Sequence, residues 1–104
     1  MLESRYQAEL IKKLKGMFLG AIVLKNDSNY LQGIPDLTLL LDGGFWALLE
    51  GKGSATAPRQ PNQEYYVDKA AEMSFGAFIC PENEEEVLSD LQRAYESHRN
   101  ARFS

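Results

Sequence analysis

Apolar residues near the start of the chain recur at spacings of three and four: Leu2, Tyr6, Leu10, Ile11 and Leu14. That period places them on one face of a helix, so the pattern predicts an amphipathic helix over residues 2–15. Gly16 follows the last of them and is expected to end the helix. The next segment, Met17–Leu24, is rich in apolar and β-branched residues and predicts a buried strand.

Two further apolar runs are separated by a glycine-rich triplet. Residues 36–41 and 45–50 flank Asp-Gly-Gly at positions 42–44, and glycines accept the positive φ angles that tight hairpin loops require. The pattern therefore predicts a β-hairpin. Pro35 is expected to lie outside its first strand, because proline cannot donate to a ladder.

The register of this hairpin brings charged residues together. If the triplet forms the loop, Leu41 faces Phe45, and counting back places Asp36 opposite Glu50. Opposed side chains in an antiparallel pair have Cβ atoms about 4.5–5.5 Å apart. Two carboxylates that close repel each other unless a proton or a cation lies between them. Lys52, two positions after Glu50, shares its face, so three charged side chains are expected to converge at one end of the sheet.

The rest of the chain continues the alternation of helices and strands. A polar loop is predicted at residues 51–62, a helix at 62–74, a strand at 75–80 and a final helix from Asn83. The order α-β-β-β-α-β-α predicts one α/β domain over residues 1–104, with helices flanking a small mixed sheet.

The formal net charge of −4 is concentrated in one segment. Residues 82–90 hold five acids and no base, which leaves the remainder of the chain at +1. Acidic residues are typical of the first turn of a helix, where the macrodipole favours negative charge. A nucleic-acid-binding face elsewhere on the surface is therefore compatible with the composition.

Cysteine and histidine are too scarce for most metal sites. Cys80 and His98 are the sole residues of their types, which excludes an intrachain disulfide framework and a multi-cysteine zinc site. Carboxylate oxygens can still bind a hard cation. The sequence shows no secretory leader and no apolar run long enough to cross a bilayer, which predicts a cytoplasmic protein without a membrane partner.

The expected cluster of Asp36, Glu50 and Lys52 has a clear chemical use. Two carboxylates can bind Mg²⁺, which lowers the pKa of a bound water and neutralises charge on a phosphoryl oxygen. A neighbouring lysine can orient that water or stabilise developing negative charge. Charged residues also keep an edge hairpin soluble, so spacing alone leaves a purely structural role open.

The same residues resemble a known nuclease motif. Ile34-Pro35-Asp36, followed after the hairpin by Glu50-Gly51-Lys52, is similar to the PD-(D/E)xK motif. The wider pattern includes Gly33 and also Gln63, and it resembles the VRR-NUC branch of that superfamily over residues 3–80. The resemblance implies a restriction-endonuclease-like α/β core.

The resemblance also implies a role for each matching residue. The catalytic residues would be Asp36, Glu50, Lys52 and Gln63, and the metal ligands would be Glu3, Asp36, Glu50 and the carbonyl of Gly51. Mg²⁺ is the expected cofactor, and Mn²⁺ can substitute for it. Glu9 competes with Glu3 as the acid of the first helix, and Glu3 is preferred. The family usually has an apolar residue where this chain has Gly51, which predicts a less rigid site.

The expected activity is that of a Mg²⁺-dependent endonuclease that hydrolyses DNA phosphodiester bonds in replication, recombination or repair. The resemblance implies a bacterial or phage-infected cell as its setting. A homodimer with two sites on a two-fold axis would suit branched DNA such as a Holliday junction. The alternative is a catalytically impaired nuclease fold that binds DNA or a partner protein. Candidate phosphate contacts are Lys12, Lys13, Lys15 and the loop residue Arg59.

Overall fold

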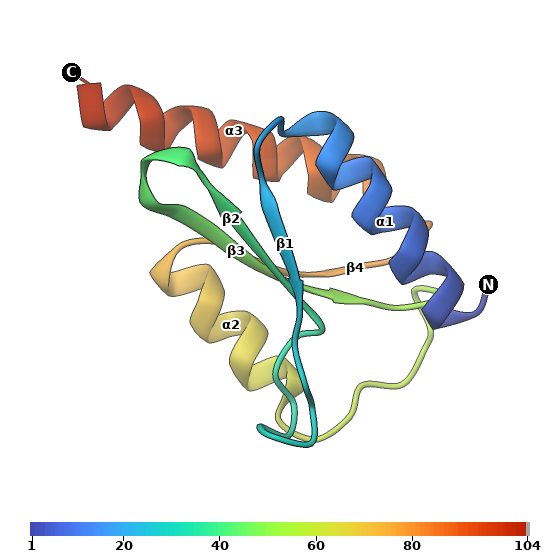
Figure 1. Ribbon diagram of the computed structural model, residues 1–104. Helices are drawn as coiled ribbons and strands as arrows, with labels where there is room; N and C mark the ends of the chain where they lie inside the picture. The colour runs from blue at the N-terminus through green and yellow to red at the C-terminus, as the bar shows by residue number, and fades with distance from the viewer. Residues whose placement is uncertain (104) are drawn as a thin grey trace.

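The computed structural model describes residues 1–103 and contains a four-stranded sheet in the order β1-β2-β3-β4. The elements along the chain are α1 (Glu3–Met17), β1 (Ile22–Lys25), β2 (Leu37–Leu41), the 3₁₀ turn η1 (Asp42–Gly44), β3 (Phe45–Gly51), α2 (Gln63–Met73), β4 (Gly76–Ile79) and α3 (Glu84–Phe103). The first three strands are antiparallel and β4 runs parallel to β3 (Figure 1). The predicted order and the mixed sheet flanked by helices are confirmed.

One face of the sheet forms the main core. Leu37, Leu39, Ala47 and Leu49 point to this face and are fully buried. They pack with the apolar stripes of α1 and α3, which cover this face. The helix α2 packs on the opposite face, where Gly76 of β4 approaches its backbone (Figure 1).

The hairpin of β2 and β3 has the register predicted from the sequence. Leu41 pairs with Phe45 and Leu37 pairs with Leu49. The turn holds Gly43 and Gly44 at φ angles of 82°, in the region that glycine adopts most easily. Because the pairing alternates without a bulge, the residues just beyond Leu37 and Leu49 also meet side by side.

The first helix is longer than the sequence pattern predicts. It passes through Gly16 and ends at Met17, and the amide of Phe18 still donates to the carbonyl of Leu14 at 3.0 Å. The chain then reverses near Gly20, whose φ is +84°. The glycine that permits the turn is therefore Gly20, and the expected strand over residues 17–24 is wrong in its first half.

The strand β1 is also less buried than predicted. It pairs with β2 alone and lies at the edge of the sheet. Ile22 and Leu24 remain 56% and 46% exposed, because α2 lies over β3 and β4 and leaves the β1 end of that face open. Apolar composition predicted a strand here but could not tell an edge strand from a central one.

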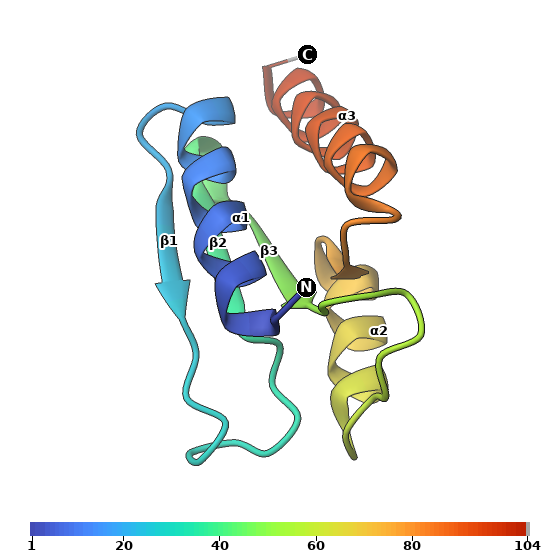
Figure 2. The same ribbon diagram turned by 90° about the vertical axis from the view of Figure 1, so that its right-hand side faces the viewer.

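The acidic segment lies at the start of α3, as its composition predicts. Glu84 accepts a hydrogen bond from the hydroxyl of Tyr6 at 2.8 Å and pairs with Lys13. These contacts join the start of α3 to α1, which Figure 2 shows in front of β2 and β3. Among residues 1–103 no helix is both long and apolar enough to span a membrane.

Candidate active site

Asp36 and Glu50 lie side by side where β2 begins and β3 ends. Each carboxylate accepts a hydrogen bond from the backbone of the opposite strand. The amide of Asp36 donates to Glu50 Oε1 at 3.2 Å, and the amide of Gly51 donates to Asp36 Oδ1 at 3.1 Å. The hairpin register and these two bonds fix both side chains at one end of the sheet.

The environment of this pair disfavours two negative charges. Glu50 is 5% exposed, and burial followed by the charge of Asp36 raises its pKa to about 7. Burial also raises the pKa of Asp36, and the hydrogen bond from the Gly51 amide offsets this rise only in part. The two carboxylates therefore repel each other unless they share a proton or a cation.

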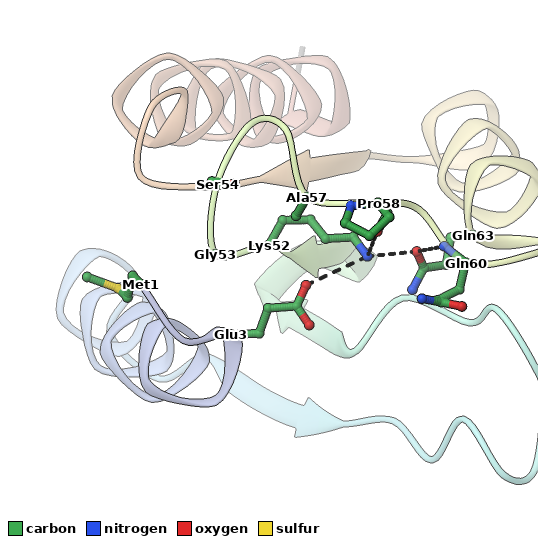
Figure 3. A pocket seen from close by; sticks show the side chains of 9 residues that line it. All are labelled: Met1, Glu3, Lys52, Gly53, Ser54, Ala57, Pro58, Gln60 and Gln63. Carbon is green, nitrogen blue, oxygen red and sulfur yellow. Dashed lines mark hydrogen bonds and ion pairs between the residues drawn. The ribbon is translucent and has the colours of Figure 1, made fainter.

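Lys52 follows on the same strand, and its ammonium group is enclosed by oxygen atoms (Figure 3). Its side chain is 7% exposed. The Nζ atom donates to the carbonyl of Pro58 at 3.1 Å and lies 3.9 Å from Glu50 Oε2. The amide of Lys52 donates to the carbonyl of Ile79, so pairing with β4 continues past the end of β3.

Gln63 is the first residue of α2 and its side chain points to this lysine (Figure 3). Its Oε1 atom accepts from Lys52 Nζ at 2.9 Å and from the amide of Gln60 at 2.8 Å. Gln63 is 9% exposed. The structure therefore brings Gln63, which follows the long loop, into direct contact with Lys52, which follows the hairpin.

Glu3 reaches the cluster from the first turn of α1. Its Oε1 atom lies 3.7 Å from Lys52 Nζ, and its side chain is 54% exposed. Glu9, the competing candidate, pairs instead with Arg5 at 3.6 Å on the outer face of the helix. Of the two acids, Glu3 is the one that lies at the cluster.

Gln7 belongs to the cluster although the sequence reasoning did not select it. Its Nε2 atom donates to Asp36 Oδ2 at 3.0 Å, so both oxygens of Asp36 are held by donors. Gln7 follows Glu3 by four residues, a spacing that places two side chains on one face of a helix. That spacing is the signal that could have identified it.

Two adjoining hollows open on the cluster. The larger has a volume of about 570 Å³ and is lined by Asp36 and Glu50, and the smaller, of about 380 Å³, is lined by Lys52. Glu3 and Gln63 line both of them. Together they form a polar groove between the loop after β1 and the loop after β3.

The candidate phosphate contacts lie elsewhere. The guanidinium of Arg59 stacks over the ring of Phe78 at 3.8 Å and pairs with Glu64 at 3.0 Å. Lys13 is paired with Glu84. Neither basic side chain lines the hollow that contains Asp36 and Glu50.

The donor set of the cluster is rich in oxygen. Within residues 1–103 there is no group of three or more His, Cys, Asp and Glu side chains arranged to hold a metal ion. Asp36 and Glu50 are held beside each other by the two hydrogen bonds from the opposite backbone, whereas Glu3 lies beside Lys52. A cation at this place would therefore take two carboxylates from the protein and complete its shell with other oxygens.

Comparison with known proteins supports the fold. No protein-family model and no curated protein matches the chain. A solved structure described as a "VRR_NUC domain" is similar, with a TM-score of 0.61 and 20% sequence identity over 90% of this chain and 94% of that chain. The chain therefore has the fold of a VRR_NUC domain, in agreement with the resemblance of its motif.

Proposed function

We propose that the chain is a metal-dependent nuclease domain that hydrolyses phosphodiester bonds in DNA. The observation that carries the proposal is the convergence of the half-buried carboxylate of Asp36 and the buried carboxylate of Glu50 with the buried ammonium group of Lys52. This convergence occurs at one end of the sheet in a fold shared with a VRR_NUC domain.

The residues fit a magnesium ion. Mg²⁺ is bound in proteins by one or two carboxylates and retains several waters, which suits a site with two close acids. The charges of Glu3, Asp36 and Glu50 against that of Lys52 leave a net charge of −2, which a divalent cation neutralises. The cation would also remove the repulsion that raises the pKa of Glu50.

The backbone of Gly51 can supply a further oxygen. Its amide points toward Asp36, whereas the next amide, of Lys52, points to β4. In an extended strand the N–H and C=O of one residue point to the same side, so the Gly51 carbonyl is also directed toward the acids. This carbonyl would be a further ligand of an ion held by Asp36 and Glu50.

The chain's own residues prepare the groove for hydrolysis. The cation, when bound, supplies Lewis-acid polarisation of the phosphate and a water of lowered pKa. Lys52 places a positive charge at the groove, where it stabilises negative charge that develops on the phosphate. Gln63 and the carbonyl of Pro58 fix the direction of that ammonium group by accepting hydrogen bonds from it. Gln7 fixes the second oxygen of Asp36.

The finer proposal is an endonuclease that acts on branched DNA as a homodimer. The larger hollow has a volume of about 570 Å³, so a single domain encloses only a short stretch of one strand. Two copies related by a two-fold axis would present two grooves, a symmetry that matches the paired strands of a four-way junction. Mg²⁺ is the proposed cofactor, with Mn²⁺ as a substitute.

A second candidate is a nuclease fold that binds DNA without cutting it. It is favoured by the finding that, within the described residues, no third His, Cys, Asp or Glu side chain is arranged with Asp36 and Glu50 to hold a metal ion. In such a protein Lys52 would serve as an internal counter-charge for the two acids rather than as a group that contacts phosphate.

Cleavage of labelled duplex, flap and four-way-junction DNA separates the two candidates. With Mg²⁺ or Mn²⁺ the wild-type chain should cut at least one substrate, and Lys52→Ala should lower the rate by about 100-fold or more. Lys69→Ala removes an exposed lysine of α2 and should leave the rate unchanged. Junction binding without cleavage by the wild-type chain would establish the binding module instead.

Metal binding is measured separately by isothermal titration. Asp36→Asn should abolish the binding of Mn²⁺ or Mg²⁺, because it removes one of the two close carboxylates. Asp42→Asn changes an exposed aspartate in the hairpin turn and should bind metal as the wild type does. Equal binding by both variants would refute the assigned metal site.

A further inference from the structure

The loop between β1 and β2, residues 26–34, has a defined conformation and is called the β1–β2 loop below. At its base, the side-chain amide of Asn26 donates to the carbonyl of Pro35 and to Thr38 Oγ1, both at 2.8 Å. At its tip, the amide of Tyr30 donates to the carbonyl of Asp27 at 3.1 Å, which closes a tight turn. Hydrogen bonds therefore hold the loop both at its base and at its tip.

Tyr30 lies at the tip of this loop with 90% of its surface exposed. A single exposed aromatic residue is common on protein surfaces and carries no function by itself. Tyr30, however, lies between Asn29 and Gln32 in the sequence, next to the first and two residues before the second, and both of these line the groove that contains Asp36 and Glu50. Its ring is thus carried by the segment that forms one wall of the proposed active site.

The larger hollow, which holds Asp36 and Glu50, is lined by amide side chains and, among the described residues, by no Lys, Arg or His. Within the described residues, the side chains of Asn29, Gln32 and Gln60 line it and make no hydrogen bond to other groups. Phosphate backbones are usually contacted by Lys and Arg. Free amides instead combine a donor and an acceptor, as the edges of nucleic-acid bases do.

We propose that the β1–β2 loop binds an unpaired DNA base beside the scissile phosphate. The ring of Tyr30 stacks on the face of the base, and the amides of Asn29, Gln32 and Gln60 hydrogen-bond to its edge. In an intact duplex the faces of a base are stacked and its Watson–Crick edge is paired, so neither of these is available to the loop. The substrate class is therefore DNA with an unpaired nucleotide near the cut, such as a flap, a gap or a junction with open bases.

This inference rests on the proposed function for the place of the cut, but not for the binding itself. The binding test uses the full-length chain with Ca²⁺ in place of Mg²⁺, so that hydrolysis is not required. The probes are a fully paired duplex and the same duplex with a 2-aminopurine in an unpaired segment. Fluorescence anisotropy gives the affinity, and 2-aminopurine emission reports stacking of the unpaired base.

The wild type should bind the probe with the unpaired segment more tightly than the duplex and should quench its emission. Tyr30→Ala should weaken that binding by about 10-fold and restore the emission, while duplex binding stays the same. Tyr30→Phe keeps the ring and should behave as the wild type does. Tyr65→Ala removes another exposed tyrosine, 62% exposed on α2, and should change neither value.

Equal binding of the unpaired probe by wild type and Tyr30→Ala would overturn the inference. A loss that is the same for duplex and unpaired probes would also overturn it. The outcome is independent of the nuclease proposal. If the chain cuts DNA but Tyr30→Ala has no effect on binding, the nuclease proposal stands and this inference fails. If binding depends on Tyr30 but no DNA is cut, this inference stands and the nuclease proposal fails. Tyr30→Ala should retain the wild-type melting temperature, since the side chain is exposed.

Discussion

Lys52 Nζ donates a hydrogen bond of 2.9 Å to Gln63 Oε1, and this bond connects the end of β3 with the first turn of α2 across an eleven-residue separation. The lysine is 6% exposed and the glutamine 9%. A buried ammonium group has few rotamers that satisfy its three donors. Gln63 therefore selects the direction in which the charge of Lys52 points.

Gln63→Ala should lower the rate of DNA cleavage by about 10- to 100-fold, the usual cost of losing a partner that orients a functional group. The variant should still bind metal, because Asp36 and Glu50 are untouched. Steady-state cleavage and metal titration on the same preparation measure the two effects. Gln92→Ala removes an exposed glutamine of α3 as the control, and an equal effect of both substitutions would contradict the orienting role.

Gln7→Leu should weaken metal binding, because Asp36 Oδ2 then loses the donor that holds it at 3.0 Å. Outer partners of metal ligands typically contribute about 10–100-fold in affinity. Titration with Mn²⁺ measures this directly. Gln7→Glu is the sharper variant, since it keeps the shape of the side chain and replaces the donor by an acceptor. Unchanged affinity in Gln7→Glu would remove Gln7 from the site.

Glu50→Gln should stabilise the metal-free protein at neutral and higher pH. The pKa of Glu50 is about 7 in the folded chain and 4.5 without the fold, so the folded state binds the proton more tightly. The contribution of this group to the free energy of unfolding is therefore full below pH 4.5 and is lost as pH rises toward 7. Asp36 shifts in the same direction.

Thermal unfolding in EDTA at a series of pH values tests this sign. The wild type should lose stability relative to Glu50→Gln as pH rises from 4.5 to 7, and the two curves should approach each other at the acid end. Glu64→Gln, an exposed glutamate of α2, should run parallel to the wild type. Mg²⁺ should then stabilise the wild type more than Glu50→Gln. A wild type that gains stability with rising pH relative to Glu50→Gln would contradict the buried, repelled state of this carboxyl.

Gly51→Ala should be tolerated and should stabilise the fold by about 0.5–1 kcal/mol, because alanine has less freedom to lose in a strand. A Cβ atom at this position would lie 3.6 Å from Asp36 Oδ2 and 3.8 Å from the ring of Tyr6, which are ordinary contacts. Gly76→Ala is the contrast, since its Cβ would lie 2.4 Å from the carbonyl of Val67 and should lower the melting temperature. Loss of stability in Gly51→Ala would show that the glycine is needed there.

The hairpin shows how far local sequence determines the fold. Two consecutive glycines after Asp42 set the loop length, and the loop length sets the register that brings Asp36 to Glu50. The start of β1 could not be predicted in the same way. Gly16 and Gly20 are both plausible stops by composition, and only packing of Phe18 into the core decides that the helix continues past the first.

The site was predicted where its residues lie on the hairpin and less completely where they come from helices. The roles assigned to Asp36, Glu50, Lys52 and Gln63 stay predictions, but their proximity follows from strand pairing and from the position of Gln63 at the start of α2. The position of the Gln7 side chain depends on the angle at which α1 packs against the sheet. That angle is fixed by buried contacts of residues far apart in sequence, which periodicity does not specify.

The two loops that border the groove touch each other at Gly33. Its α-carbon lies so close to the neighbouring loop that an added Cβ would be 2.5 Å from the Cβ of Asn62 and 2.7 Å from the carbonyl of Pro61. The chain leaves Asn62 directly into Gln63, the partner of Lys52. The β1–β2 loop therefore packs directly against the segment that leads into Gln63, so any side chain larger than glycine at position 33 would displace the start of α2 or the loop itself.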